Sequence, residues 1–333
     1  MRIRRRELWF VGPKKVELRE GAPGPALGPG QVKAHALYSA ISQGTELLLY
    51  RGEGPQVFDS SLLSEAVQGF PLRYGYCWVG QIVESGAADV SMGQHVLALR
   101  PHGDEHVLAA DEMRVLPDAV PPLRATLAPM LETAVNIVWD SGVGLGDRVV
   151  VLGGGVVGLL AAMLCKRAGA SVVAMVEPSA RRRHCAQLLG VDEARPPEED
   201  APAADADVVI EATGSPALLD RAIAHAAFEA TIVVASFYGE RRTPISLGDA
   251  FHRRRLLLKS SQVSHLPAAK LARWSHARRF ALVLELLVDS RLDGLIDPAV
   301  PFDVAAATYA RLDADPVTAL HTVFAYDLQQ RRV

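Results

Sequence analysis

The sequence is poor in cysteine and contains no long apolar run. Its three cysteines, Cys77, Cys165 and Cys185, are scattered and odd in number. This excludes a disulfide framework and is typical of a reducing compartment. No apolar stretch is long enough to span a bilayer. The basic run at residues 2–6 is not followed by the apolar segment of about 7–15 residues that a secretory signal needs, so we expect a cytoplasmic protein outside the membrane.

The sequence also lacks a strong charge of either sign. It has 35 Lys and Arg against 38 Asp and Glu, a net charge of −3. This balance gives no reason to expect a nucleic acid or an acidic membrane surface as partner. Hydrophobic residues make up 49% and charged residues 22% of the chain, as in ordinary globular enzymes. The length of 333 residues predicts two domains.

A glycine-rich turn is the strongest motif that the sequence does contain. The apolar run Val149–Leu152 predicts a buried parallel strand, and it leads into Gly153, Gly155 and Gly158, the G-x-G-x-x-G positions. The first glycine allows a tight turn, the second lets the backbone approach a pyrophosphate, and the third lets a helix pack on the strand. That helix is expected from residue 157 to about 168. Its N-terminus suits a diphosphate.

The residues after this helix favour a dinucleotide. A second strand is expected over Val172–Val176 and ends on Glu177, about 20 residues past the glycines, where an acid binds adenosine ribose hydroxyls. Strand–glycine–helix turns also occur for purely structural reasons, but this context predicts dinucleotide binding. Glu177 would repel a 2′-phosphate, which favours NAD. Arg181 just beyond it could serve NADP instead, or the arginines at 181–183 are the solvated start of a helix.

The rest of the chain falls into segments of different pattern. Up to about residue 125, short strand-like runs broken by Gly and Pro predict a small barrel-like β domain. From about residue 127, helix and strand patterns alternate, which predicts an α/β unit. A last segment, with a helix near 278–288 and a strand at 322–326, is expected to return to the first domain. The other expected strands are 32–38, 78–84, 95–99, 105–109, 207–212, 231–235 and 256–263, and a helix is expected over 128–140.

This order of elements resembles the medium-chain dehydrogenase/reductase superfamily. Ser42–Glu46 stands where that family has C-G-T-D, and Tyr74–Gly80 where it has G-H-E-x-x-G; Leu145–Val149 and Glu211–Ser215 are further family-like segments. The resemblance implies a GroES-like β-rich catalytic domain (1–126), a Rossmann NAD(P)-binding domain (127–264) and a return to the catalytic domain (265–333). By overall look, the nearest subgroup includes bacteriochlorophyllide a dehydrogenase-like proteins.

The ligands of the zinc-dependent members of this family are missing. Such members hold zinc by a Cys, a His and a further Cys or acid. Here the Cys position holds Gln43, or Ser42 if one residue is inserted, and the His position holds Tyr76 followed by Cys77. The third region offers only Glu132. One thiol and one carboxylate are too few, and the lobe of clustered cysteines around a structural zinc is also absent, so we expect no metal.

His102 and His106 offer an alternative metal pair. On a helix, residues four apart share a face and can chelate. The flanking residues indicate a strand, along which four residues span about 13 Å, too far for a shared ion. We therefore interpret this segment as a polar loop that leads into a strand, from which His102 alone could point into the active cleft.

Without zinc, other groups must polarise the substrate oxygen. By family resemblance Thr45 occupies a position that often relays the proton, and Tyr76 occupies a metal-ligand position with a phenol that could protonate an alkoxide. Two or three hydrogen bonds, each worth about 3–4 kcal/mol, could replace a metal. The structural alternatives are a packed aromatic ring for Tyr76 and a turn-capping hydroxyl for Thr45. Glu46 more often supports architecture than chemistry, and it completes the catalytic candidates with His102.

The resemblance also implies further cofactor contacts. The adenosine side is expected to involve Thr213 and Gly214. The residues expected near the nicotinamide are Val157, Thr133, Phe237, Tyr238 and Ser261.

We therefore expect a zinc-independent NAD(P)-dependent oxidoreductase that interconverts an alcohol with an aldehyde or ketone, with a small-molecule substrate and no nucleic-acid or membrane partner. A reductase of quinones or enones (activated C=C bonds) and a non-catalytic dinucleotide-binding redox sensor are the alternatives. The expected strand 256–263 would lie at the open edge of the Rossmann sheet. Because Lys259 is its only charged residue and it contains no proline, we expect a homodimer that pairs this edge.

Overall fold

The computed structural model describes residues 5–21, 26–54 and 69–327, so residues 2–4 of the basic run lie outside it. Contacts divide the chain into two compact units, Met1–Pro129 with Leu287–Val333, and Met130–Leu286. We call them the mixed-sheet unit and the parallel-sheet unit, after the sheets that they contain. Within the described ranges, no helix is both long enough and apolar enough to span a membrane.

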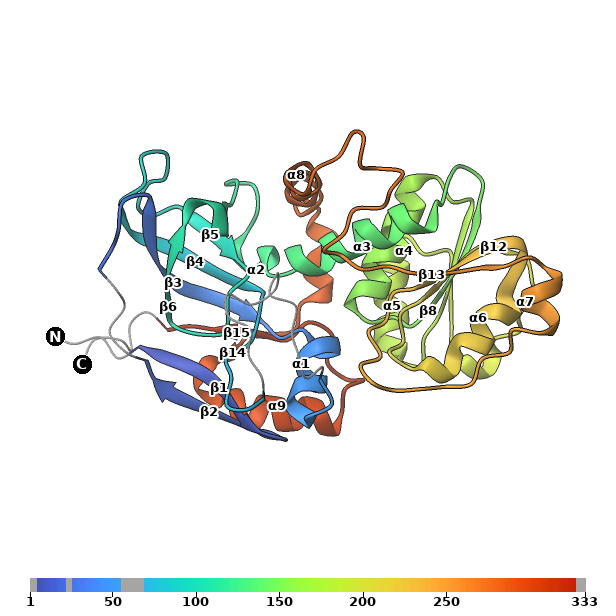
Figure 1. The fold of residues 1–333 in the computed structure, drawn as a ribbon, viewed down its shortest axis with the longest axis horizontal. Helices are drawn as coiled ribbons and strands as arrows, with labels where there is room; N and C mark the ends of the chain where they lie inside the picture. The colour runs from blue at the N-terminus through green and yellow to red at the C-terminus, as the bar shows by residue number, and fades with distance from the viewer. Residues whose placement is uncertain (1–4, 22–25, 55–68, 328–333) are drawn as a thin grey trace. The chain divides into compact units, whose positions relative to one another are not determined.

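The mixed-sheet unit is built on a sheet with the strand order β14-β15-β3-β4-β5-β7, in which β6 also pairs with β3 (Figure 1). A separate two-stranded sheet pairs β1 with β2. All of these pairs are antiparallel except β14 with β15. The element bounds are β1 (Arg6–Gly12), β2 (Lys15–Glu20), β3 (Gln31–Ala40), α1 (Gln43–Arg51), β4 (Trp78–Ser85), β5 (His95–Ala98), β6 (Glu105–Ala109), β7 (Met113–Val115), α2 (Pro122–Ala125), β14 (Val300–Pro301), α9 (Ala305–Ala314) and β15 (Val323–Ala325).

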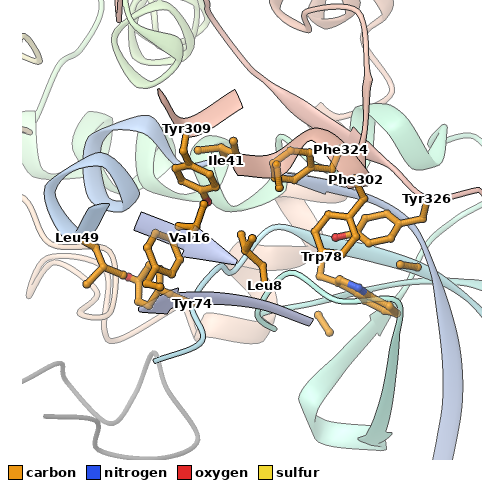
Figure 2. Packing of buried hydrophobic residues seen from close by; sticks show 14 of the residues in the cluster. Leu8, Val16, Ile41, Leu49, Tyr74, Trp78, Phe302, Tyr309, Phe324 and Tyr326 are labelled. Carbon is orange, nitrogen blue, oxygen red and sulfur yellow. The ribbon is translucent and has the colours of Figure 1, made fainter. Parts of the chain in front are cut away.

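The core of this unit is rich in aromatic rings. Trp78, Tyr309 and Phe324 are fully buried, and they pack with aliphatic side chains of β1, α1 and the β-sheet (Figure 2). The Phe302 and Phe324 rings lie 5.5 Å apart between centroids. Residues from both ends of the chain therefore close one core, which places α9 and β15 with β1 and β3.

The parallel-sheet unit has the strand order β10-β9-β8-β11-β12-β13, with every pair parallel. The strands alternate with helices, and Figure 1 shows α4 and α5 on one face and α6 and α7 on the other. The bounds are α3 (Ala128–Ser141), β8 (Arg148–Leu152), α4 (Val156–Ala168), β9 (Val172–Val176), α5 (Ala180–Leu188), β10 (Glu193–Arg195), β11 (Ala206–Glu211), α6 (Leu219–His225), β12 (Ala226–Val234), α7 (Asp249–Arg253), β13 (Leu257–Ser260) and α8 (His276–Leu286).

This order is the Rossmann order, in which the chain reverses its direction of growth between β8 and β11. Ligands of such sheets bind beyond the carboxyl ends of the strands at that reversal. The expected fold class, a β-rich sheet domain with a Rossmann domain, is confirmed.

Two segments differ from the sequence expectation. The last strand covers only 257–260 instead of 256–263, because the chain turns after it and the Gln262 carbonyl accepts a hydrogen bond from the His265 amide at 3.2 Å. In addition, α8 belongs to the parallel-sheet unit, although residues from 265 on were expected in the returning segment. The Arg279 guanidinium on α8 donates to Glu132 and Asn136 of α3 at 3.0 and 2.7 Å, which ties the two helices together.

Candidate functional site

The glycine turn joins β8 to α4, at the carboxyl end of the central strand. Gly153 has a φ of +98°, and a Cβ on it would lie 2.8 Å from the Ala212 carbonyl oxygen. A Cβ on Gly158 would lie 2.0 Å from the Gly153 carbonyl oxygen, whereas a Cβ on Gly155, the N-cap of α4, would meet nothing within 4 Å. The first and third glycines are therefore required by packing. The second leaves open space at a helix N-terminus, which suits a phosphate group.

Glu177 is tied directly to this turn. Its side chain is buried at the end of β9, where Oε2 accepts from the Gly154 amide at 2.7 Å and Oε1 from the Ser179 amide at 2.8 Å. The Arg182 guanidinium lies 4.0 Å from Oε2, and Arg181 is exposed on α5. Each carboxylate oxygen has a further lone pair, so Glu177 can accept from ribose hydroxyls while it holds the turn.

A second cluster forms at the end of β11. Glu211 is fully buried there and accepts hydrogen bonds from the Thr213 amide at 2.7 Å and from the Thr213 and Tyr238 hydroxyls. Burial, and then the Glu211 carboxylate, raise the pKa of the Tyr238 phenol above its ordinary value. The Gly214 amide donates to Ser236 Oγ at 2.8 Å. Thr213 and Tyr238, both expected at the cofactor, are thus brought together at Glu211, and Gly214 follows Thr213 directly.

The other expected cofactor residues lie on separate elements of the same unit. Ser261 follows β13, where its hydroxyl donates to Asp140 Oδ2 at 2.8 Å. Phe237 is 52% exposed. Thr133 on α3 and Val157 in the first turn of α4 are partly buried. Thus Phe237 and the first turn of α4 have exposed surface for a ligand.

The expected catalytic hydroxyls lie in the mixed-sheet unit. The Tyr76 hydroxyl donates to Ser42 Oγ and is also hydrogen-bonded to Thr45. Burial raises the pKa of the Tyr76 phenol well above 10, with smaller contributions from Cys77 and Tyr74, whereas the bonds to Ser42 and Thr45 lower it in part. The phenol therefore stays protonated near neutral pH, and it belongs to a cluster of hydroxyl groups at the start of α1.

Glu46 and His102 lie behind this cluster in a buried hydrogen-bond network. His102 Nε2 is 2.9 Å from Glu46 Oε2, and His102 Nδ1 is 2.6 Å from Ser39 Oγ. The other Glu46 oxygen accepts from the Ser42 amide at 2.9 Å. Both ring nitrogens of His102 are engaged, and the side chain is buried, so this histidine does not present a ring nitrogen to a substrate.

Two tyrosines extend the network from the far end of the chain. The Tyr309 hydroxyl donates to Glu46 Oε2, and the Tyr326 hydroxyl lies 2.6 Å from Ser39 Oγ. Sequence reasoning missed Ser39, Tyr309 and Tyr326. Ser39 follows the strand expected over 32–38, Tyr326 ends the one expected over 322–326, and Tyr309 lies on α9, so no local pattern in the sequence identifies them as partners.

Whether these residues fit a catalytic zinc ion follows from their chemistry. Zinc takes thiolate, imidazole or carboxylate ligands. Ser42, Gln43 and Tyr76 offer hydroxyls and an amide, and burial raises the pKa of the Cys77 thiol well above its ordinary value, which keeps it protonated. In the parts of the chain that the structure describes, no group of three His, Cys, Asp or Glu side chains is placed to hold a metal ion. The donor set does not fit zinc.

The structure also tests whether His102 and His106 could bind one metal ion. β6 begins at Glu105, so His106 lies on a strand, where its Nε2 is 2.9 Å from the Pro101 carbonyl oxygen. The two histidines have different partners and do not form a pair.

A Rossmann sheet with this glycine turn, joined in one chain to a β-rich unit, is the architecture of a nucleotide-dependent dehydrogenase. Residues 156–281 match the family model described as zinc-binding dehydrogenase. D-guloside 3-dehydrogenase of Escherichia coli (strain K12) is 29% identical over 313 residues, which cover 85% of this chain and 89% of that protein.

Two solved structures share the fold over nearly the whole chain. One, from Sinorhizobium meliloti 1021 and bound to NADP, has a TM-score of 0.78 at 20% identity and covers 97% of this chain and 99% of its own. The other, an alcohol dehydrogenase from Escherichia coli CFT073 complexed with NADH, has a TM-score of 0.76 at 18% identity and the same coverage, 97% and 99%.

The chain is an NAD(P)-dependent dehydrogenase with the fold of the medium-chain dehydrogenase/reductase family. The expected subgroup is corrected, because the named relative is a D-guloside dehydrogenase and not a bacteriochlorophyllide dehydrogenase.

Proposed function

We propose that this protein is a zinc-independent dehydrogenase that interconverts a secondary alcohol of a sugar or polyol with the corresponding ketone. One observation carries the proposal: hydroxyl groups of Ser42, Tyr76 and Thr45 are hydrogen-bonded together. By the family resemblance, these residues come from the two segments that carry the first two ligands in zinc-dependent members. The name of D-guloside 3-dehydrogenase, a relative that aligns with most of the chain, supports a sugar-like substrate.

In this proposal the hydroxyl cluster takes over the polarising role of the metal. The Tyr76 phenol stays protonated, and Ser42 Oγ, which accepts the hydrogen of Tyr76, keeps its own hydrogen for a further acceptor. During ketone reduction, negative charge develops on the substrate oxygen. Donors already aimed at that oxygen each contribute about 3–4 kcal/mol to stabilising it. Tyr76 delivers the proton through Ser42 Oγ. A proton from solvent, relayed by Thr45, restores the phenol, so that the ketone takes up one hydride and one proton.

Glu46 and His102 act as positioning residues in this proposal. The Glu46 carboxylate holds the Ser42 amide at 2.9 Å and is itself fixed by His102 at 2.9 Å. Both side chains are buried, so they set the first turn of α1 rather than contact a substrate.

The cofactor residues would hold NAD in preference to NADP. Gly153, Gly155 and Gly158 with the α4 N-terminus would bind the diphosphate, and Glu177 the adenosine ribose. Arg181, Thr213, Gly214 and Tyr238 are proposed further contacts, as are Val157, Thr133, Phe237 and Ser261. The bound nicotinamide accepts or gives the hydride.

Turnover of a defined panel tests this function. Purified protein is assayed with NAD⁺ and NADP⁺ on methyl hexosides, linear polyols and inositols, and with NADH and NADPH on quinones and enones. We expect NAD-linked oxidation of a sugar or polyol. Turnover confined to quinones or enones would identify the C=C reductase, and NADH binding without any turnover would identify a redox sensor; either result rejects the proposal.

We also propose a cytoplasmic homodimer. All three cysteines are buried and none forms a disulfide among the described residues, which agrees with a reducing compartment. β13 pairs with β12 on one side only, and its Leu257 is 54% exposed. An open edge of this kind pairs readily with a second copy.

A further inference from the structure

Gln43 is a polar residue at the start of α1 that the hydroxyl cluster does not use. Its side-chain Nε2 is buried and has no hydrogen-bond partner among the described residues. The residue before it, Ser42, carries the hydroxyl that accepts from Tyr76, and Thr45 two residues on is bonded to the same phenol. A buried donor without an acceptor thus adjoins the proposed catalytic hydroxyls in the chain.

Such a donor is costly unless something accepts from it. Leaving a buried amide donor unsatisfied forfeits the hydrogen bonds that it makes to water, and buried polar groups in folded proteins are nearly all satisfied. The neighbouring polar groups are bonded to one another: the Ser42 amide donates to Glu46, and the Glu46 carboxylate is shared with His102 and Tyr309. The Ser42 amide and the Glu46 carboxylate are thus engaged with each other and with His102 and Tyr309, whereas Gln43 Nε2 can still donate to an acceptor from outside the described residues.

The chemistry of the amide defines that acceptor. The NH₂ group carries two hydrogens and no lone pair that can accept, so its partner must be an oxygen such as a hydroxyl or carbonyl oxygen. A simple alcohol has one oxygen, which the hydroxyl cluster already receives in the proposed reaction. A sugar or polyol carries a second oxygen on the carbon next to the reacting one.

We infer that Gln43 is a substrate-binding, specificity-determining residue, whose amide donates to the hydroxyl on the carbon next to the one that is oxidised. This rests on the proposed function and deepens it, because it predicts that the protein selects vicinal diols over simple alcohols. A site that hydrogen-bonds a substrate hydroxyl discriminates strongly against the analogue without it, since the site's own polar group is then left unpaired.

The test compares substrates that differ by one hydroxyl. Methyl D-guloside and its 2-deoxy and 4-deoxy analogues are assayed for kcat/KM with NAD⁺, and their Kd values for the protein–NADH complex are measured by calorimetry. Gln43→Leu and Gln43→Glu remove the donor at nearly constant size. We expect kcat/KM for the intact glycoside to fall about tenfold in each variant. For the analogue that lacks the hydroxyl bound by Gln43, either the 2-deoxy or the 4-deoxy compound, kcat/KM should stay within about twofold of the wild-type value. Gln81→Leu is the control, because the Gln81 amide already donates to the Gly93 carbonyl at 3.2 Å.

The outcomes separate this inference from the proposed function. If both Gln43 variants still prefer the intact glycoside over its deoxy analogues as strongly as the wild type does, the amide binds only water. This result overturns the inference while the dehydrogenase assignment stands. Binding of the glycoside without oxidation rejects the sugar dehydrogenase, while the Kd ratios still decide the role of Gln43. Absence of both binding and turnover with all three glycosides rejects both.

Discussion

At the scale of single residues, the protonation state of the proposed proton donor depends on its burial. Tyr76 sits against Ser42 and Thr45, and its pKa is raised because the phenolate would be poorly solvated there. A buried neutral phenol is a hydrogen-bond donor over the whole physiological pH range. The proposed site therefore works with donors that need no activation by a metal.

Removing the Tyr76 hydroxyl tests this donor role. Tyr76→Phe should lower kcat/KM by about 10²–10³-fold, because the phenol that supplies the proton to the developing oxyanion through Ser42 in the proposed reaction is lost. The Kd for NADH should stay unchanged, since the nucleotide residues lie in the parallel-sheet unit. Tyr38→Phe on β3 is the matched control. A loss below about threefold would show that Tyr76 is only a packed aromatic ring.

Glu177 tests the cofactor preference. Glu177→Ala should weaken NADH binding and raise the NADPH:NADH affinity ratio, because the ribose acceptor and the charge that repels a 2′-phosphate are both removed. Glu177→Gln removes the charge but keeps an oxygen that can accept the 2.7 Å hydrogen bond from the Gly154 amide. Comparison of the two variants therefore distinguishes the effect of the charge from that of the hydrogen bond. Fluorescence titration gives the ratio. A wild-type protein that already prefers NADPH would contradict the assignment.

Two buried histidines predict how stability depends on pH. Burial lowers the pKa of His106 to about 3 and that of His321 to about 4. Unfolded histidines titrate near ~6.5, so below that pH the unfolded chain binds more protons and the free energy of unfolding falls. At pH 5 each histidine accounts for about 2 kcal/mol.

Substitution checks this account of pH dependence. His106→Gln should reduce the stability difference between pH 7 and pH 5 by about 2 kcal/mol, measured by urea unfolding, because Gln does not titrate. His184→Gln, at an exposed position on α5, is the control. An unchanged difference in His106→Gln would mean that this ring is protonated in the folded protein.

At the scale of elements, the short edge strand β13 carries the assembly prediction. We expect a dimer at micromolar concentration by light scattering, and Leu257→Lys should convert it to a monomer, because a charge at an exposed edge opposes pairing. Ala194→Lys on β10, the other edge of the same sheet, should leave the dimer intact. A wild-type monomer, or a dimer that both variants preserve, would reject this edge as the interface.

The elements show which features a sequence alone can predict. The glycine turn was predictable because local geometry forces it: Gly158 packs directly against the Gly153 carbonyl oxygen. The network around Glu46 was not, since its partner Tyr309 is 263 residues away and only the closed core brings them together. The length of β13 depended on the turn after it, where side chains of α3 hold Ser261. Local rules predict the turn, and tertiary packing decides the network and the strand end.

At the scale of the whole molecule, the chain combines a conventional family fold with an unusual donor set. It matches a family model described as zinc-binding over residues 156–281, a range that lies wholly within the parallel-sheet unit. The hydroxyl cluster lies in the other unit, outside that match. The match to the family model therefore supports nucleotide binding by the parallel-sheet unit. The proposal for how the substrate oxygen is polarised rests on residues of the mixed-sheet unit.

Metal content measured together with activity tests this claim most directly. Tag-free protein is dialysed against a strong chelator, analysed for zinc by mass spectrometry and assayed with NAD⁺ and its sugar or polyol substrate. The account predicts zinc far below stoichiometric amounts and an unchanged kcat after chelation. Stoichiometric zinc in the isolated protein, with activity that is lost on chelation and restored by adding zinc, would contradict it.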